Sequence, residues 1–172
     1  DEQYKEFYHH ISHNFDDPWM TLHFKAEGNI EYTGLLFIPS EMPYDLFQPD
    51  KKNSLKLYVN KVFISDKVEE LMPSYLRFVK GVIDSADLSL NISREMLQHS
   101  ALIEKIKHGT VSRLLKELKK RAQNYDDYMK FWQNFGIAFK EGIYEDFANR
   151  EEIASLSYFA STHDENKLTT LD

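Results

Sequence analysis

Apolar residues near the amino end recur every three or four positions, and this spacing predicts a short helix over residues 2–11. An acidic pair followed by proline at 16–18 ends that pattern. Residues 20–26 then alternate between apolar and polar, as expected of a strand with one buried face. The Gly-Asn pair at 28–29 favours a turn, so the sequence predicts that residues 30–38 pair with this strand as a hairpin.

The middle of the chain is less regular. Prolines and polar residues interrupt 39–53, which indicates a long loop. The pattern of residues 55–64 predicts a third strand. Its apolar residues lie at odd positions before 60–61 and at even positions after them, which indicates a β-bulge there. A helical stretch is expected over 66–81. Asp66 would cap it, Pro73 would begin its second part and Gly81 would end it. A short strand and a loop are expected in 82–92.

Beyond residue 100 the sequence predicts only helices, over 101–122, 126–139 and 150–159. The second of them carries an aromatic stripe with the spacing of one buried helix face: Tyr128, Trp132, Phe135 and Phe139. The fold class expected from these patterns is α/β (α+β), with a β-rich mixed sheet layered with helices and then a small helical bundle.

The same patterns predict where the chain divides. We expect an α/β layered subdomain over 1–98 and a helical bundle over 99–162. Residues 163–172 are polar and are expected to lead to a further subdomain that is not present.

Composition excludes several classes of protein. The 172 residues carry a formal charge of −7, which argues against a dedicated nucleic-acid binder. The absence of cysteine excludes disulfides, thiol catalysis and cysteine zinc sites. No apolar run approaches membrane-spanning length, and the amino end carries no signal peptide. We therefore expect a cytoplasmic protein whose partners include neither nucleic acid nor membrane.

Residues 84–98 contain the most informative pattern. Leu88, Leu90 and Ile92 alternate, which predicts an extended segment that runs into a helix at Ser93. Serine suits the N-cap position, because its hydroxyl accepts hydrogen bonds from the free N–H groups of the first turn.

Three polar residues of this segment could face one ligand. Arg94 places a cation against the helix dipole, and Gln98 lies four residues later on the same face. With Asn91 they would suit an anion that binds from outside the domain. The alternative is that Arg94 pairs with a surface carboxylate while Asn91 and Gln98 make local hydrogen bonds.

Several blocks of the sequence together resemble the middle domain of the heat shock protein 90 chaperones, most closely the bacterial form. The most specific block is Leu-Asn-Ile-Ser-Arg-Glu-Met-Leu-Gln at 90–98. The other blocks lie at 7–8, 36–39, 57–59, 77–85, 141–142 and 145–146. The resemblance therefore covers essentially the whole chain. Ala86 and Ser89 depart from it, since the family more often has Glu and Pro there.

The resemblance implies that the chain is the middle segment of an ATP-dependent chaperone that assists protein folding. ATP and Mg²⁺ would bind a separate N-terminal nucleotide-binding domain, absent here, and Arg94 would contact the γ-phosphate when that domain docks. Asn91 and Gln98 match family positions that steady the same loop, and Phe63 matches a position that packs on the nucleotide-binding domain. The full-length parent would be a homodimeric ATPase that binds unfolded client proteins, whereas the fragment alone would hold no cofactor.

The loop expected at 40–53 is a second candidate surface. Tyr44, Leu46 and Phe47 crowd into a segment whose prolines prevent regular pairing in a sheet. Leu46 and Phe47 could tuck under the loop as a small apolar cluster. Alternatively the three side chains are exposed and contact client proteins, as the resemblance implies for this neighbourhood.

Two further patterns favour ordinary structure. His9 and His13 have the spacing of metal ligands on a helix, but no nearby group completes a site, so we expect no metal. The lysines and arginines of 105–121 favour a solvated helix face over an RNA surface, because aromatic residues are not interleaved with them. Two other classes stay open besides the chaperone segment: a non-enzymatic protein-interaction module and, against the acidic charge, an RNA-binding α/β domain.

Overall fold

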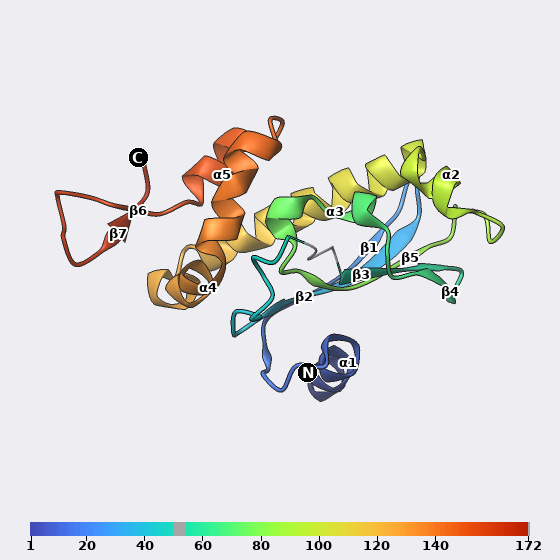
Figure 1. Cartoon of the computed structure of the whole chain (residues 1–172), viewed down its shortest axis with the longest axis horizontal. Coiled ribbons are helices and arrows are strands. Elements are labelled where there is room, and N and C mark those ends of the chain that lie inside the picture. Colours follow the sequence, from blue (N-terminus) through green and yellow to red (C-terminus); the bar gives the residue numbers. More distant parts are fainter. Residues whose placement is uncertain (50–53, 172) are drawn as a thin grey trace.

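Helices lie on both faces of a five-stranded mixed sheet in the computed structural model of the chain (Figure 1). The structure describes residues 1–49 and 54–171, without the side chains of Ser54 and Arg94. The elements are α1 (Glu2–Ser12), β1 (Pro18–Ala26), β2 (Tyr32–Pro39), β3 (Ser54–Val59), β4 (Val62–Ser65), the short 3₁₀ turns η1 (Glu69–Leu71) and η2 (Ser74–Leu76), β5 (Lys80–Ser85), α2 (Arg94–Gln98), α3 (Ala101–Arg121), α4 (Tyr125–Glu145), α5 (Arg150–Ser155), β6 (Phe159–Ala160) and β7 (Leu168–Thr169).

The sheet has the strand order β1-β2-β5-β3-β4, so β5 occupies its centre. β1 and β2 form the predicted antiparallel hairpin, β5 runs antiparallel to β2, and β3 runs parallel to β5. The alternation of apolar and polar residues and the turn residues therefore predicted the first hairpin, whereas nothing in the local sequence indicates the long-range pairing of β5.

One helix covers each face of the sheet (Figure 1). On one face, the buried ring of Tyr8 in α1 lies 5.4 Å from the ring of Phe37 in β2. On the other face, the Arg113 guanidinium of α3 lies 5.0 Å from the ring of Phe24 in β1. Tyr8 lies on the apolar face expected of α1, whereas Arg113 is one of the basic residues of 105–121 expected on a solvated face, and its partly buried side chain contacts the sheet instead.

Beyond the sheet, α3 leads to the helices α4 and α5 at the opposite end of the molecule from α2 (Figure 1). The predicted aromatic stripe of α4 is buried, and Phe135 stacks on Phe78, which precedes β5, with 4.6 Å between ring centroids. Buried residues of the sheet, of α3 and of α4 form one continuous core, which does not include Tyr8 and Phe37 on the α1 face. The fold class expected from the sequence is confirmed, and the division at residues 98 and 162 stays a prediction.

The helix expected over 66–81 is wrong. The region holds only η1 and η2, and Gly81 lies inside β5 instead of closing a helix. Gly81 has φ = +144°, and a Cβ there would lie 2.2 Å from the carbonyl oxygen of Leu35 in the neighbouring strand. Only glycine adopts this conformation easily and allows so close an approach, so its role is in the sheet.

The prediction of one strand over 55–64 with a β-bulge at 60–61 is also wrong, because these residues form two strands, β3 and β4, whose register irregularity lies between Leu57 and Tyr58. Asn60 and Lys61 both have positive φ, +48° and +66°, and form the tight turn between β3 and β4. Such a turn matches the twist of paired strands, so the parity change marks a reversal of the chain. At the carboxyl end, α5 ends at Ser155, short of the expected residue 159, and the small β6–β7 hairpin was not predicted.

Candidate functional site

Residues 86–98 leave the end of the central strand β5 and continue into α2 at one extremity of the molecule (Figure 1). The start of this segment is fixed to the β1–β2 connection. The amide of Ala86 donates to the carbonyl of Glu31 at 3.2 Å, and the Asp87 carboxylate accepts from the Glu31 amide. The side chain of Leu88 is buried. The segment therefore begins from a rigid base.

The next residues project into solvent. Leu88 is buried and Leu90 is exposed, but the backbone between β5 and α2 forms bends and a turn instead of the expected extended segment, so that prediction is wrong. The turn is local, because the amide of Asn91 donates to the Ser89 hydroxyl at 3.3 Å and that of Ile92 to the Ser89 carbonyl at 3.2 Å. Serine side chains favour such turns over regular strands.

The helix α2 has the predicted cap and one buried anchor. The Ser93 hydroxyl accepts a hydrogen bond from the Met96 amide at 3.3 Å, which confirms Ser93 as the N-cap. Leu97 is 2% exposed, whereas Met96 beside it is exposed. The segment is thus held by a buried leucine at each end, Leu88 and Leu97.

The three polar candidates belong to this exposed segment. Asn91 lies in the turn before α2, and Gln98 is the last residue of α2; both are exposed. The backbone of Arg94 starts α2, but its side chain lies outside the described part of the structure, so the joint orientation of the three groups stays a prediction.

Phe63 lies at the same end of the sheet. The β3–β4 turn is fixed to the end of β5, since the Lys61 amide donates to the Asp84 carboxylate at 3.0 Å and the Asn60 amide to the Ser85 carbonyl at 3.2 Å. Phe63 follows this turn on an edge strand and is 51% exposed, with its ring 5.6 Å from that of Tyr58. An exposed aromatic beside the projecting segment can pack on another apolar surface.

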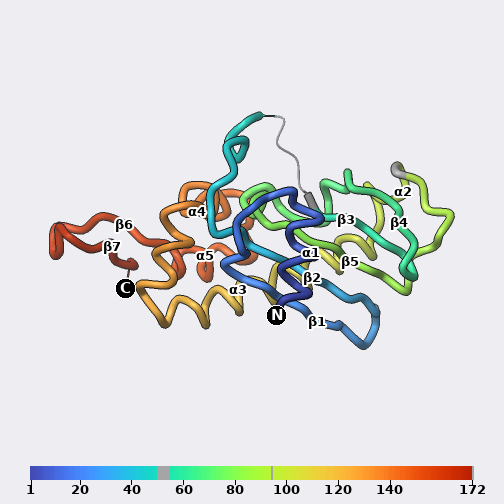
Figure 2. The backbone as a smooth tube through the Cα atoms, turned by 90° about the horizontal axis from the view of Figure 1, so that it is seen from below, coloured from blue at the N-terminus to red at the C-terminus, as the bar shows by residue number. Residues whose placement is uncertain are grey.

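In the loop after β2, two of the three candidate side chains are exposed to solvent and one is buried. Tyr44 is 93% exposed and Phe47 is 48% exposed, whereas Leu46 is 1% exposed and belongs to the core. Leu46 is therefore an anchor of the loop in this conformation and offers no surface to a client. The backbone of this segment projects on one side of the molecule (Figure 2), and the part of the predicted loop at 50–53 lies outside the described residues.

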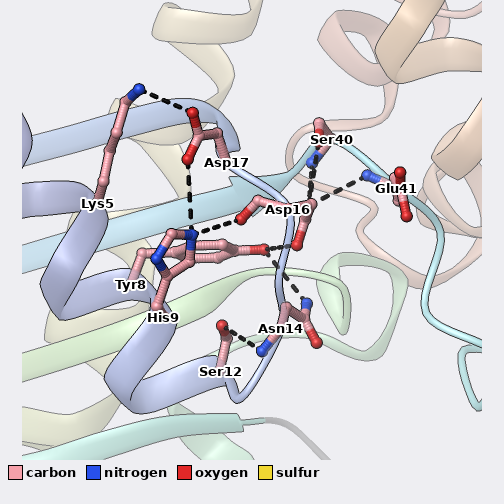
Figure 3. A network of polar contacts seen from close by, with 9 residues as sticks. All are labelled: Lys5, Tyr8, His9, Ser12, Asn14, Asp16, Asp17, Ser40 and Glu41. Carbon is pink, nitrogen blue, oxygen red and sulfur yellow. Dashed lines mark hydrogen bonds and ion pairs between the residues drawn. The ribbon is translucent and has the colours of Figure 1, made fainter.

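The root of that loop is held by a polar network (Figure 3). One oxygen of the Asp16 carboxylate accepts from the Tyr8 hydroxyl at 2.9 Å, and the other accepts from the Ser40 amide at 2.8 Å and the Glu41 amide at 3.3 Å. Burial raises the pKa of Tyr8, so its phenol stays protonated and donates. The network joins α1 to the loop, a link that the sequence did not indicate.

Of the histidine pair noted in the sequence, His9 makes a structural contact. A ring nitrogen of His9 lies 2.9 Å from the Asp16 carbonyl oxygen, which places that histidine in the network of Figure 3. Within residues 1–49 and 54–171, no three His, Asp or Glu side chains gather as they would around a metal ion. In the same described part, no helix has both the length and the apolar character to cross a membrane.

Comparisons with known proteins agree on one family. The family model described as Hsp90 protein matches residues 1–172. The curated chaperone protein HtpG of Paramagnetospirillum magneticum is 60% identical over 99% of the chain, and that of Rhodospirillum rubrum is 57% identical over 94%. The middle domain of a Plasmodium falciparum heat shock protein superposes with a TM-score of 0.86 at 32% identity, over 99% of this chain and 66% of that one.

The chain belongs to the heat shock protein 90 family, and the resemblance read from its sequence blocks is confirmed. It corresponds to the middle domain of that family. The chain spans only 27% of the length of the P. magneticum relative and 26% of that of R. rubrum.

Proposed function

We propose that the chain is the middle segment of an ATP-dependent chaperone and supplies Arg94 to ATP bound in a separate N-terminal domain. The observation that carries this proposal is the projecting segment 89–96, held at both ends by the buried leucines 88 and 97; apart from the partly buried Ile92, its described side chains are exposed. A short capped helix on a fixed base can bring a side chain to a neighbouring domain without reorganising the core.

The chemistry expected of Arg94 is electrostatic. When the nucleotide-binding domain docks, the guanidinium would neutralise negative charge that develops on the transferred γ-phosphoryl group, with Mg²⁺ as the other cation. Asn91 and Gln98 would steady the segment at the nucleotide-binding domain. Phe63, exposed at the same end of the sheet, would pack on that domain in the closed state.

The test is ATP turnover by the full-length protein that contains this chain. Arg94→Ala should lower turnover by about 10²–10³, as expected when a positioned cationic donor is lost. Nucleotide affinity should change much less, because the contact forms mainly in the closed state. Arg94→Lys should rescue poorly, since one ammonium group cannot reproduce the planar fork.

Met96→Ala is the matched control, because Met96 is an exposed neighbour on the same helix. It should leave turnover within about twofold, the small effect usual for an exposed residue. Turnover of the Arg94→Ala protein within twofold of wild type would refute the assigned role and favour the interaction module without chemistry. Salt-dependent RNA binding by the chain would favour the third class.

The exposed pair Tyr44 and Phe47 supports a second part of the proposal, a surface for unfolded client proteins. Exposed aromatic groups on a loop that is itself fixed to the core form a binding surface at little entropic cost. Replacing both by Ser should weaken capture of an unfolded protein with little change in melting temperature. Leu46→Ser should instead destabilise the fold, because it buries a polar group in the core.

The full-length protein is proposed to be a homodimer in the cytoplasm, as the family assignment suggests. Its other partner is its own nucleotide-binding domain.

A further inference from the structure

Arg77 lies where three separate parts of the chain meet, and its side chain is only 12% exposed. It follows η2, faces α4 and reaches the loop after β2. Its Nε donates to the carbonyl oxygen of Leu46 at 2.9 Å, and one terminal nitrogen donates to the carbonyl of Ser74 at 3.0 Å. One guanidinium therefore bonds to the backbone of two segments that are far apart in sequence.

The same guanidinium forms a two-pronged ion pair with α4. Its two terminal nitrogens lie 2.6 and 3.0 Å from the two carboxylate oxygens of Glu141. Paired hydrogen bonds between a guanidinium and a carboxylate fix both distance and plane, and each is about twice as strong as a neutral hydrogen bond. Arg77 is thereby locked against α4, so the donor that reaches the Leu46 carbonyl has a fixed position.

The loop is held on both sides of Tyr44. Before it, Asp16 accepts from the amides of Ser40 and Glu41, and the Asn134 side chain of α4 donates to the Ser40 carbonyl at 2.9 Å. After it, Arg77 holds the Leu46 carbonyl, and its guanidinium lies 5.5 Å from the centre of the adjacent Phe47 ring.

The exposed aromatic groups thus belong to a segment that is fixed on both sides of Tyr44. A loop that is already ordered loses little further conformational entropy when a ligand binds.

We propose that Arg77 is a positioning residue that holds the Tyr44–Phe47 segment in the conformation that presents its aromatic side chains. This inference rests on the proposed client surface. Lysine cannot replace Arg77, because a single ammonium group on a flexible stem cannot serve two backbone carbonyls and both oxygens of a carboxylate at once.

Hydrogen–deuterium exchange of the chain tests the proposal, read at the amides of Leu46 and Gln48, which close the turns of the loop. Arg77→Lys should speed exchange there by about 10-fold or more, the equivalent of about 1.4 kcal/mol, since a charge-assisted hydrogen bond is lost. The amides that pair β2 with β5 should keep the wild-type rate. An unchanged rate in the loop, or equal acceleration in loop and sheet, would overturn the proposal.

A charge swap separates the backbone contacts from the ion pair. The double change Arg77→Glu with Glu141→Arg keeps two opposite charges but removes the donor to the Leu46 carbonyl, so loop exchange should stay fast. Wild-type exchange in that protein would overturn the assignment to Arg77. Arg121→Lys is the matched control, because Arg121 pairs with Asp127 at 3.2 Å between α3 and α4, and loop exchange should not respond. Accelerated loop exchange in it would overturn the proposal too.

Capture of a labelled, carboxymethylated and permanently unfolded lactalbumin by the full-length protein links the loop to the proposed function. Arg77→Lys should weaken capture about 3- to 10-fold, a loss of roughly 0.7–1.4 kcal/mol. If the loop loosens as expected and capture does not change, the client surface is refuted while the exchange result still supports the positioning role. If capture falls without a change in loop exchange, the positioning role is refuted and the client surface stands.

Discussion

The anchor Leu97 offers the sharpest test of how the projecting segment is built. α2 has five residues, and helices this short are unstable on their own. Its own stabilising features are the Ser93 cap, about 1 kcal/mol, and the dipole interaction of Glu95, about 0.3–1 kcal/mol. Leu97→Ala removes a methine and two methyl groups from a side chain that is 2% exposed. At about 0.8 kcal/mol for each carbon, the lost burial is about 2.5 kcal/mol.

This loss exceeds what the cap and dipole supply, so we expect α2 to open locally while the core stays folded. Exchange at the Met96 and Leu97 amides, which bond to Ser93, should accelerate by about 70-fold. In the full-length protein, ATP turnover should fall with it, because Arg94 would no longer be held in place. Hydrogen–deuterium exchange followed by mass spectrometry reads both the segment and the sheet in one experiment.

Met96→Ala is the control, because Met96 lies on the same helix and is exposed. It should leave exchange and turnover nearly unchanged. Wild-type protection of α2 in the Leu97→Ala protein would refute the idea that one buried leucine anchors it. A uniform loss of protection throughout the sheet would show instead that Leu97 supports the whole fold.

Three other outcomes are expected. Gly81→Ala should lower the free energy of unfolding, measured by thermal melting, by more than about 4 kcal/mol, because its Cβ would lie 2.2 Å from the Leu35 carbonyl oxygen. The Cβ of Gly28→Ala would meet open space, so that change should lower it by only about 1–2 kcal/mol, through backbone strain. Burial raises the pKa of Tyr75 and Tyr128, so the folded state keeps these protons to higher pH than the unfolded state. The free energy of unfolding should therefore fall above about pH 10, by up to about 1.4 kcal/mol per pH unit for each group. Denaturant unfolding measured at a series of pH values should show a weaker fall for the Tyr→Phe variants. The chain alone should give no saturable micromolar isotherm when ATP and magnesium are titrated calorimetrically, and such an isotherm would contradict the assignment of nucleotide binding to another domain.

Local patterns predicted the parts of the fold that depend on local physics. The β1–β2 hairpin, α1, α3 and the buried stripe of α4 follow from period and turn residues. The error over 66–81 has a physical cause at the end of the region: its apolar residues recur at helical spacing and are all buried, but residues 80–81 belong to β5, which pairs with a strand on each side. Pairing with distant strands overrode the local pattern, as tertiary context often does.

The residues of the candidate site also differ in whether the sequence could reveal them. The projecting segment and its cap could be recognised because Ser93 acts on the residues next to it. Asp16 and Arg77 could not be recognised, because their partners lie in distant parts of the chain, at Ser40, Leu46 and Glu141. Long-range polar contacts leave no periodic trace in a sequence.

The central place of β5 also determines the order in which the sheet can form. β1–β2 and β3–β4 are hairpins whose contacts are local, and such contacts form quickly. The two hairpins become one sheet only when β5 inserts between β2 and β3, which requires both to be present already. Until residue 85 has been synthesised, each hairpin carries an unpaired inner edge, the kind of edge that pairs with other chains. A chaperone domain built in this way is itself open to aggregation until its last central strand is in place.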